Sequence, residues 1–83
     1  MFKLKAPDGT NNLCGKNLAK LRRAYNPPLS QRKLAQMLQI QGYDVDHHFI
    51  RRVELGLRFV TDIEMVMLAQ ALHVGLEELV HCE

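Results

Sequence analysis

The residues with the clearest chemical potential lie in one short stretch, DHHFIRRVELG at residues 46–56. It holds two adjacent histidines and two adjacent arginines between apolar residues. Imidazoles bind metal ions or exchange protons, whereas guanidinium groups bind phosphate or make paired hydrogen bonds to guanine. The stretch is therefore a metal site, a piece of ordinary core with solvated charges, or a surface that reads another molecule.

A metal site is the least supported of these alternatives. Metal-binding helices space their ligands three or four residues apart, whereas adjacent helical residues such as His47 and His48 splay by about 100°. No Cys or His lies at the required spacing from either, and His81 with Cys82 is equally poorly placed. The chain also lacks a nucleophile elbow, a phosphate-binding loop and paired carboxylates. We therefore expect no metal, no cofactor and no enzymatic activity.

Composition is typical of a small globular protein. The 83 residues are 47% hydrophobic and 24% charged, and aromatics make up only 6%, which predicts one domain with an aliphatic core. No apolar run approaches the roughly 20 residues that span a bilayer, and residues 1–12 lack the apolar segment of a signal peptide. We expect a cytoplasmic protein without membrane contact, in which Cys14 and Cys82 stay reduced.

Charge is distributed unevenly along the chain. Residues 1–29 carry six basic residues and one acidic residue, and residues 30–60 carry five basic and three acidic residues. Residues 61–83 carry five acidic residues and no Lys or Arg. This polarity favours a protein that presents one face to an anion such as nucleic acid, although scattered solvated charge produces the same pattern.

The periodicity of apolar residues predicts helices and no strand. Residues 1–12, MFKLKAPDGTNN, form a flexible N-terminal arm, and residues 13–83 form the folded domain. A first helix places Leu18, Leu21 and Ala24 on one face, and NPP at residues 26–28 ends it. Ser30 is a favourable N-cap for a second helix, QRKLAQMLQIQ, with Leu34, Ala35 and Leu38 buried.

Three more helices follow. Asp46 begins a third at residues 46–55, where Ile50 and Val53 point inward and Gly56 ends the helix. Thr61 and Glu64 form a capping box at the start of a fourth. Its broad apolar face comprises Ile63, Val66, Met67, Leu68 and Leu72. HVG at residues 73–75 breaks that helix, and LEELV forms a short fifth. The predicted fold is all-α, a compact five-helix bundle.

Four segments in order, NLAKLRRA, LSQRKLAQML, IRRVELG and LAQALHVGLEEL, resemble the Xre family, the helix-turn-helix domain of Cro and lambda-type repressors. The resemblance covers residues 13–80. It implies a sequence-specific transcriptional regulator of bacterial or phage type, a repressor that binds double-stranded DNA at a pseudo-palindromic operator. It also implies a homodimer, for which the acidic fourth and fifth helices are the expected interface. Helix 46–55 would enter the major groove.

The resemblance, together with the chemistry and positions of the side chains, assigns roles to individual residues. The expected base-reading side chains on the third helix are His47, His48, Arg51 and Arg52, with Arg51 reaching a base or a phosphate. Those expected at the DNA backbone are Gln31, Arg32, Lys33 and Arg58, although Arg32 and Lys33 also fit a solvated face. Phe49 either meets a thymine methyl or packs against Tyr43. Finally, the resemblance implies that Glu54 forms an ion pair with Arg22 that locks the first helix to the third.

One departure from the family pattern lies between the second and third helices. Eight residues, 39–46, replace the usual turn of about three or four, which affects the angle at which the third helix docks. Two other functions remain open: an antitoxin that binds DNA but mainly holds a partner protein, and a protein-interaction module without DNA contact. The basic third helix argues against the second of these.

Overall fold

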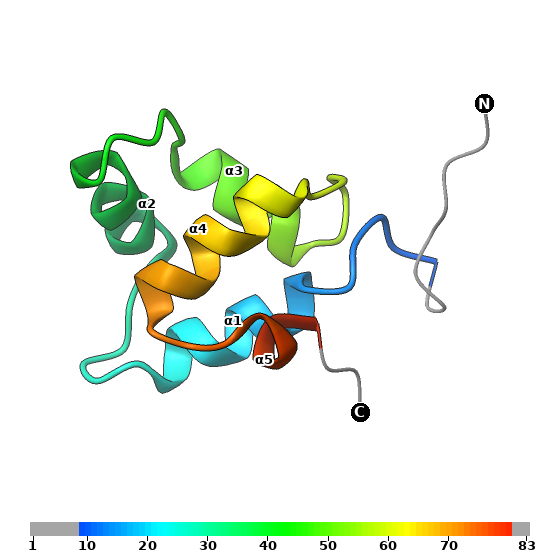
Figure 1. Cartoon of the computed structure of the whole chain (residues 1–83), viewed down its shortest axis with the longest axis horizontal. Helices are drawn as coiled ribbons and strands as arrows, with labels where there is room; N and C mark the ends of the chain where they lie inside the picture. Colours follow the sequence, from blue (N-terminus) through cyan, green and yellow to red (C-terminus); the bar gives the residue numbers. More distant parts are fainter. Residues whose placement is uncertain (1–8, 81–83) are drawn as a thin grey trace.

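The computed structural model describes residues 9–80, which form five α-helices and no strand. The helices are α1 (Gly15–Ala24), α2 (Gln31–Ile40), α3 (His47–Glu54), α4 (Asp62–Leu72) and α5 (Leu76–Val80) (Figure 1). The all-α five-helix prediction is therefore confirmed. No helix in this part of the chain is long and apolar enough to cross a membrane.

The starts of three helices are fixed by side-chain caps. In each, the side chain of the residue before the helix accepts a hydrogen bond from the N–H three residues later: Ser30 from Lys33, Asp46 from Phe49, and Thr61 from Glu64. The Glu64 carboxylate in turn accepts from the Thr61 N–H at 3.0 Å, which completes the predicted capping box. Each such cap satisfies an N–H that the helix itself leaves unpaired.

The predicted stop at Gly56 has a defined geometry. Gly56 adopts φ 74°, a left-handed conformation that glycine accepts without a Cβ penalty. Its N–H donates to the Val53 carbonyl, and the Leu57 N–H donates to the Arg52 carbonyl, both at 3.0 Å. This pair of hydrogen bonds is a Schellman motif, so α3 ends abruptly and the chain turns away.

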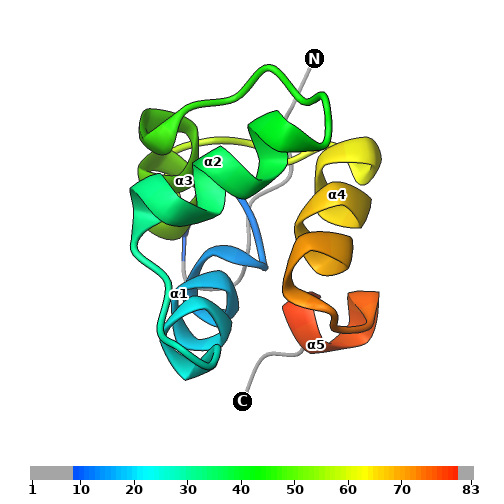
Figure 2. The ribbon, with the colours of Figure 1, turned by 90° about the vertical axis from the view of Figure 1, so that its left-hand side faces the viewer.

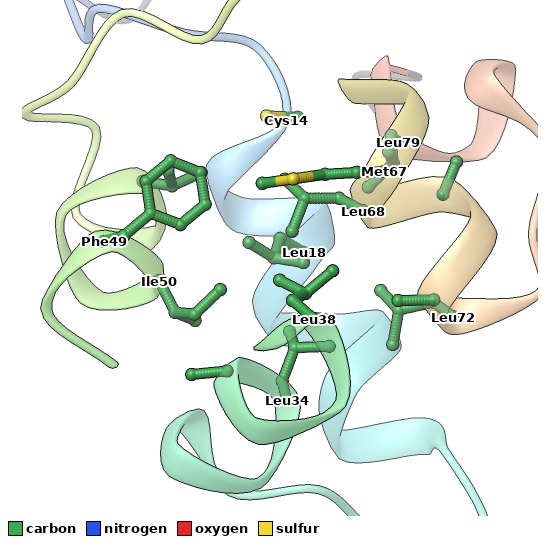
Figure 3. Packing of buried hydrophobic residues seen from close by; sticks show 14 of the residues in the cluster. Cys14, Leu18, Leu34, Leu38, Phe49, Ile50, Met67, Leu68, Leu72 and Leu79 are labelled. Atoms are coloured by element: carbon green, nitrogen blue, oxygen red, sulfur yellow. The ribbon is translucent and has the colours of Figure 1, made fainter. Parts of the chain in front are cut away.

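Every helix contributes to one hydrophobic core (Figure 3). Its fully buried members include Leu18 of α1, Leu34 and Leu38 of α2, Ile50 of α3, Leu68 of α4 and Leu79 of α5. Burying a leucine or isoleucine contributes about 1.5–3 kcal/mol. The core therefore fixes the mutual positions of all five helices in a chain of 83 residues.

The helices are arranged around this core on two sides. Helix α2 contacts both α3 and α4, and α1 contacts α3 and α5. In Figure 2, α3 and α1 lie toward the left and α4 with α5 toward the right, and α2 runs across between the two sides. The outward faces of α3 and of α4 are therefore separate surfaces.

The lengthened turn between α2 and α3 is held to the body of the protein. Helix α2 ends at Ile40, one residue earlier than predicted. The Tyr43 N–H donates to the Leu38 carbonyl at 3.1 Å, and the Gln39 side-chain amide donates to the Val45 carbonyl at 2.8 Å. Tyr43 and Val45 also pack against the core. These contacts accommodate the extra residues while Ile50 and Val53 remain fully buried.

Three predicted side-chain positions need correction. Ala24 is exposed, because α1 buries the face that carries Leu18 and Arg22. The apolar face of α4 is split: Met67, Leu68 and Leu72 are buried, whereas Ile63 is 71% exposed and Val66 is also exposed. Periodicity identified the apolar residues of α4 but did not indicate which of them face the core.

Candidate nucleic-acid interface

Helix α3 presents a polar outer face because its inner face is occupied by the core. Phe49, Ile50 and Val53 are buried, whereas His48, Arg51 and Arg52 are exposed. His47 at the first helical position is half-buried. All four side chains predicted to read bases thus lie in one helix, and three of them lie on its exposed face.

Phe49 does not belong to that outer face. It is only 9% exposed, and it points from α3 toward the core together with Ile50 (Figure 3). Of the two alternatives left open for its ring, this burial favours packing within the protein over contact with a thymine methyl. Tyr43, the other predicted neighbour, packs against the same core.

The two histidines lie closer together than their helical positions suggested. Their ring centroids are 4.1 Å apart, so the expectation that the side chains splay is wrong. Desolvation, the Arg32 cation and His48 lower the pKa of His47, while Asp46 opposes them. Lowering this pKa favours neutral imidazole, which both donates and accepts hydrogen bonds. Within residues 9–80, no group of three or more His, Cys, Asp or Glu side chains could hold a metal ion; His81 and Cys82 lie outside these residues.

The first turn of α2 brings further basic groups to the same part of the molecule. Arg32 and Lys33 are exposed, and the positive charge of Arg32 is one of the causes that lower the pKa of His47, the first residue of α3. Lys33 occupies the position where glutamate would complete a capping box, and α2 has no acidic residue in its first turn. The positive end of the helix dipole therefore lies among positive side chains, an arrangement that favours an anion.

Gln31 begins α2 and is linked to the end of α3. Its side-chain amide nitrogen donates to Oε1 of Glu54 at 3.0 Å. The amide has a second N–H and a carbonyl oxygen beyond this bond. The sequence identified Gln31 as a candidate backbone contact, but the hydrogen bond to Glu54 depends on how α2 and α3 approach each other.

Arg22 and Glu54 form the ion pair that the family resemblance implied. Arg22 Nε lies 2.7 Å from Oε2 and its NH2 group 3.0 Å from Oε1, while NH1 donates to the Leu29 carbonyl at 2.8 Å. The Glu54 hydrogen bond raises the pKa of Arg22 although burial opposes it. The pair joins α1, the segment before α2, and α3, so it fixes both helices of the helix-turn-helix.

Arg58 follows α3 and is already engaged within the protein. Its guanidinium forms an ion pair with Glu64 of α4 and lies over the Phe49 ring, 5.0 Å from the centroid. The sequence predicted that Arg58 touches phosphate. The pairing with Glu64 had no local sequence signal, because it depends on how the segment after α3 approaches the start of α4.

Two asparagines before α1 secure the end of α3, a role that sequence reasoning missed. Asn12 donates to the Val53 and Arg58 carbonyls at 3.1 and 2.8 Å and accepts from the Gly15 N–H at 2.7 Å. Asn11 makes further bonds to the Gly56 and Leu57 carbonyls. These residues fall within the predicted N-terminal arm, of which residues 1–8 lie outside the described part.

Gly15 explains why α1 and α3 approach so closely at this point. A Cβ placed on Gly15 would lie 2.2 Å from the Val53 carbonyl oxygen, a distance that no side chain tolerates. The glycine at the first position of α1 is therefore a requirement of packing against α3. Nothing in its sequence context distinguished it from a turn glycine.

Comparison with solved structures identifies a close relative. A scan against protein-family models finds no match, and a search of curated proteins also finds none. Among solved structures, the chain is similar to the restriction-modification controller protein C.AhdI from Aeromonas hydrophila, with 34% identity and a TM-score of 0.66. The match covers 78% of this chain and 88% of that one. The chain therefore belongs to the family of small helix-turn-helix proteins that includes the restriction-modification controller C.AhdI.

Proposed function

We propose that this protein is a sequence-specific DNA-binding transcriptional regulator of the Xre type that reads the major groove with α3. The observation that carries the proposal is the exposed face of α3, on which Arg51, Arg52 and His48 stand together on a helix held rigidly from behind. The family relationship to a controller protein supports it independently.

In this proposal, side chains of α3 contact bases and side chains at the start of α2 contact the DNA backbone. Arg52 makes a bidentate contact to guanine, His47 and His48 supply looser hydrogen bonds to bases, and Arg51 reaches a base or a phosphate. Contacts to the DNA backbone come from the start of α2, where Gln31, Arg32 and Lys33 meet a phosphate at the helix N-terminus. We propose that Arg58, in the segment after α3, contacts the next phosphate.

We further propose that the protein acts as a homodimer through α4 and α5. Ile63 and Val66 of α4 and Leu76 of α5 are exposed apolar side chains on helices that lie opposite α3 (Figure 2). The exposed acidic residues Glu77 and Glu78 keep this side away from DNA. A twofold dimer would place its two α3 helices about 34 Å apart, which predicts a pseudo-palindromic operator.

The regulatory output that we propose is repression of a promoter that overlaps the operator, inside the bacterial cytoplasm. A regulator of a restriction-modification system is the specific version that the C.AhdI relationship suggests. A reporter fused to the promoter should fall when the protein is supplied, and a rise would indicate an activator.

Selection from a random duplex library tests the DNA-binding proposal. Enrichment of a palindromic sequence with half-sites about one helical turn apart is the expected result. A library that stays unenriched would reject sequence-specific regulation and favour an antitoxin or another protein-binding module, for which a stable complex with a partner protein is the evidence to seek.

A further inference from the structure

The guanidinium of Arg58 bridges the α3 helix and the start of α4. Its carbon atom lies 5.0 Å from the centroid of Phe49, whose side chain belongs to the inner face of α3. On its other side, one NH2 group donates to Oε2 of Glu64, the third residue of α4. Arg58 thus has protein partners at both of these positions, while its side chain remains 42% exposed.

Glu64 is held in place for this contact. Its Oε1 accepts the Thr61 N–H at 3.0 Å as part of the capping box, which leaves Oε2 directed at Arg58. The side chain is 17% exposed. Partial burial raises the pKa of Glu64, but the hydrogen bonds from Thr61 and Arg58 outweigh it and hold the pKa below its ordinary value. Glu64 is therefore a fixed carboxylate that carries its charge at neutral pH.

Arg58 follows α3 closely along the chain. It is the fourth residue after Glu54, the last residue of the helix, and the N–H of the preceding Leu57 still donates to the Arg52 carbonyl. Its side chain is partly exposed, so that an anion approaching the end of α3 can reach the guanidinium. A carboxylate and a phosphate present the same kind of acceptor to a guanidinium. On DNA, the Arg58 guanidinium would divide its positive charge and its N–H donors between Glu64 and a phosphate oxygen.

We propose that Glu64 is an intramolecular competitor of DNA phosphate for Arg58, so that it holds the affinity for DNA below the value that the basic residues alone would give. This inference rests on the proposed function and concerns the same surface. According to this proposal, Glu64, which belongs to the capping box of α4, lowers the affinity of the protein for DNA. A regulator that is restrained in this way releases its operator more readily.

The substitution Glu64→Gln tests the proposal. Glutamine serves as well as glutamate in a capping box, so the start of α4 is kept while the charge opposite Arg58 is removed. Fluorescence anisotropy with the selected operator duplex should show about a threefold to tenfold gain in affinity at low salt. The slope of log K against log salt should become steeper by about 0.9, the value for one more neutralised phosphate.

Two matched variants separate competition for Arg58 from a general change in charge. Asp62→Asn removes the same charge from the first residue of α4, whose carboxylate bonds only to the neighbouring Ile63 N–H in the described structure; it should leave the affinity and the slope nearly unchanged. The double variant Arg58→Ala/Glu64→Gln should bind no better than Arg58→Ala. An equal gain in Asp62→Asn, or a persistent gain without Arg58, would overturn the proposal.

A measurement on the unmodified chain covers the case in which Glu64→Gln fails to fold. Titration of the carboxyl carbon-13 resonances by NMR should give Glu64 a higher pKa with operator bound than without it, by more than the corresponding change at Asp62. An equal change at the two carboxylates would count against competition.

If the wild type binds no operator, the proposed function and this inference fall together. If the wild type binds and Glu64→Gln binds equally or more weakly, only this inference falls.

Discussion

At the scale of single residues, the pair Arg22–Glu54 has the largest expected effect on stability. Both side chains are almost entirely buried, and each also bonds a second group, the Leu29 carbonyl or the Gln31 amide. Removing one partner leaves the other as a buried unpaired charge, which costs about 3–5 kcal/mol when burial is complete. Arg22→Ala and Glu54→Ala should each lower Tm strongly, as followed by circular dichroism. Exposed Arg51→Ala is the control, and an unchanged Tm in both of the first two variants would refute the role.

Arg52 and Lys33 should affect DNA binding in different ways. Arg52→Ala removes a proposed bidentate contact, so it should cost about 1–3 kcal/mol and relax the preference at one base position. Lys33→Ala removes a proposed phosphate contact, so it should weaken binding to all sequences and reduce the salt slope by about one. Anisotropy on a panel of single-base operator variants distinguishes them. Equal loss across that panel for Arg52→Ala would rule it out as a base reader.

At the scale of the helix, the caps make stability depend on pH. The Phe49 N–H lowers the pKa of Asp46 against the effect of desolvation, and hydrogen bonds also outweigh burial to lower the pKa of Glu64. A carboxyl group with a folded-state pKa below its unfolded value stabilises the fold above the unfolded value, and this stabilisation is lost as pH falls through the folded pKa. Urea unfolding should therefore show lower stability at pH 3 than at pH 6. Asp46→Asn and Glu64→Gln should each flatten this dependence, and parallel curves in all three proteins would contradict it.

Helix boundaries were predictable because their signals are local. Ser30, Asp46, Thr61 and Gly56 act on hydrogen bonds within a few residues of themselves, so sequence spacing suffices to identify them. The contacts that complete the site were not predictable in this way. The bonds from Gln31 to Glu54, from Asn12 to Val53 and from Arg58 to Glu64 depend on how separate segments approach. The burial of Phe49 and the exposure of Ile63 were not predictable for the same reason. Helical periodicity shows which residues share a face, but it does not show which other element covers that face.

At the scale of the whole molecule, the exposed apolar residues of α4 make the proposed dimer testable. Ile63→Asp places a charge within the proposed interface and should convert the dimer to a folded monomer with much weaker operator binding. Analytical ultracentrifugation measures the change, with Ile40→Asp as the matched control because Ile40 is 86% exposed on α2. A wild-type protein that sediments as a monomer on and off DNA would exclude this interface.

The separation of the α3 face from the α4–α5 side is the basis for assigning two functions to so small a chain. One side carries Arg51, Arg52, Arg32 and Lys33, and the other carries exposed Ile63 and Val66. A shared core holds the two sides in fixed relation, so that two α3 helices in a dimer would have a defined spacing. The affinity for the operator should therefore depend strictly on the distance between its two half-sites.

The most direct test of the central claim compares the affinity of the protein for its selected duplex and for a scrambled duplex between about 50 and 200 mM salt. We predict a preference of at least about 10³-fold for the selected duplex, together with a steep fall in affinity for both as salt rises. Equal affinity for the two duplexes, or binding that ignores salt, would contradict the claim that α3 is a DNA-reading helix.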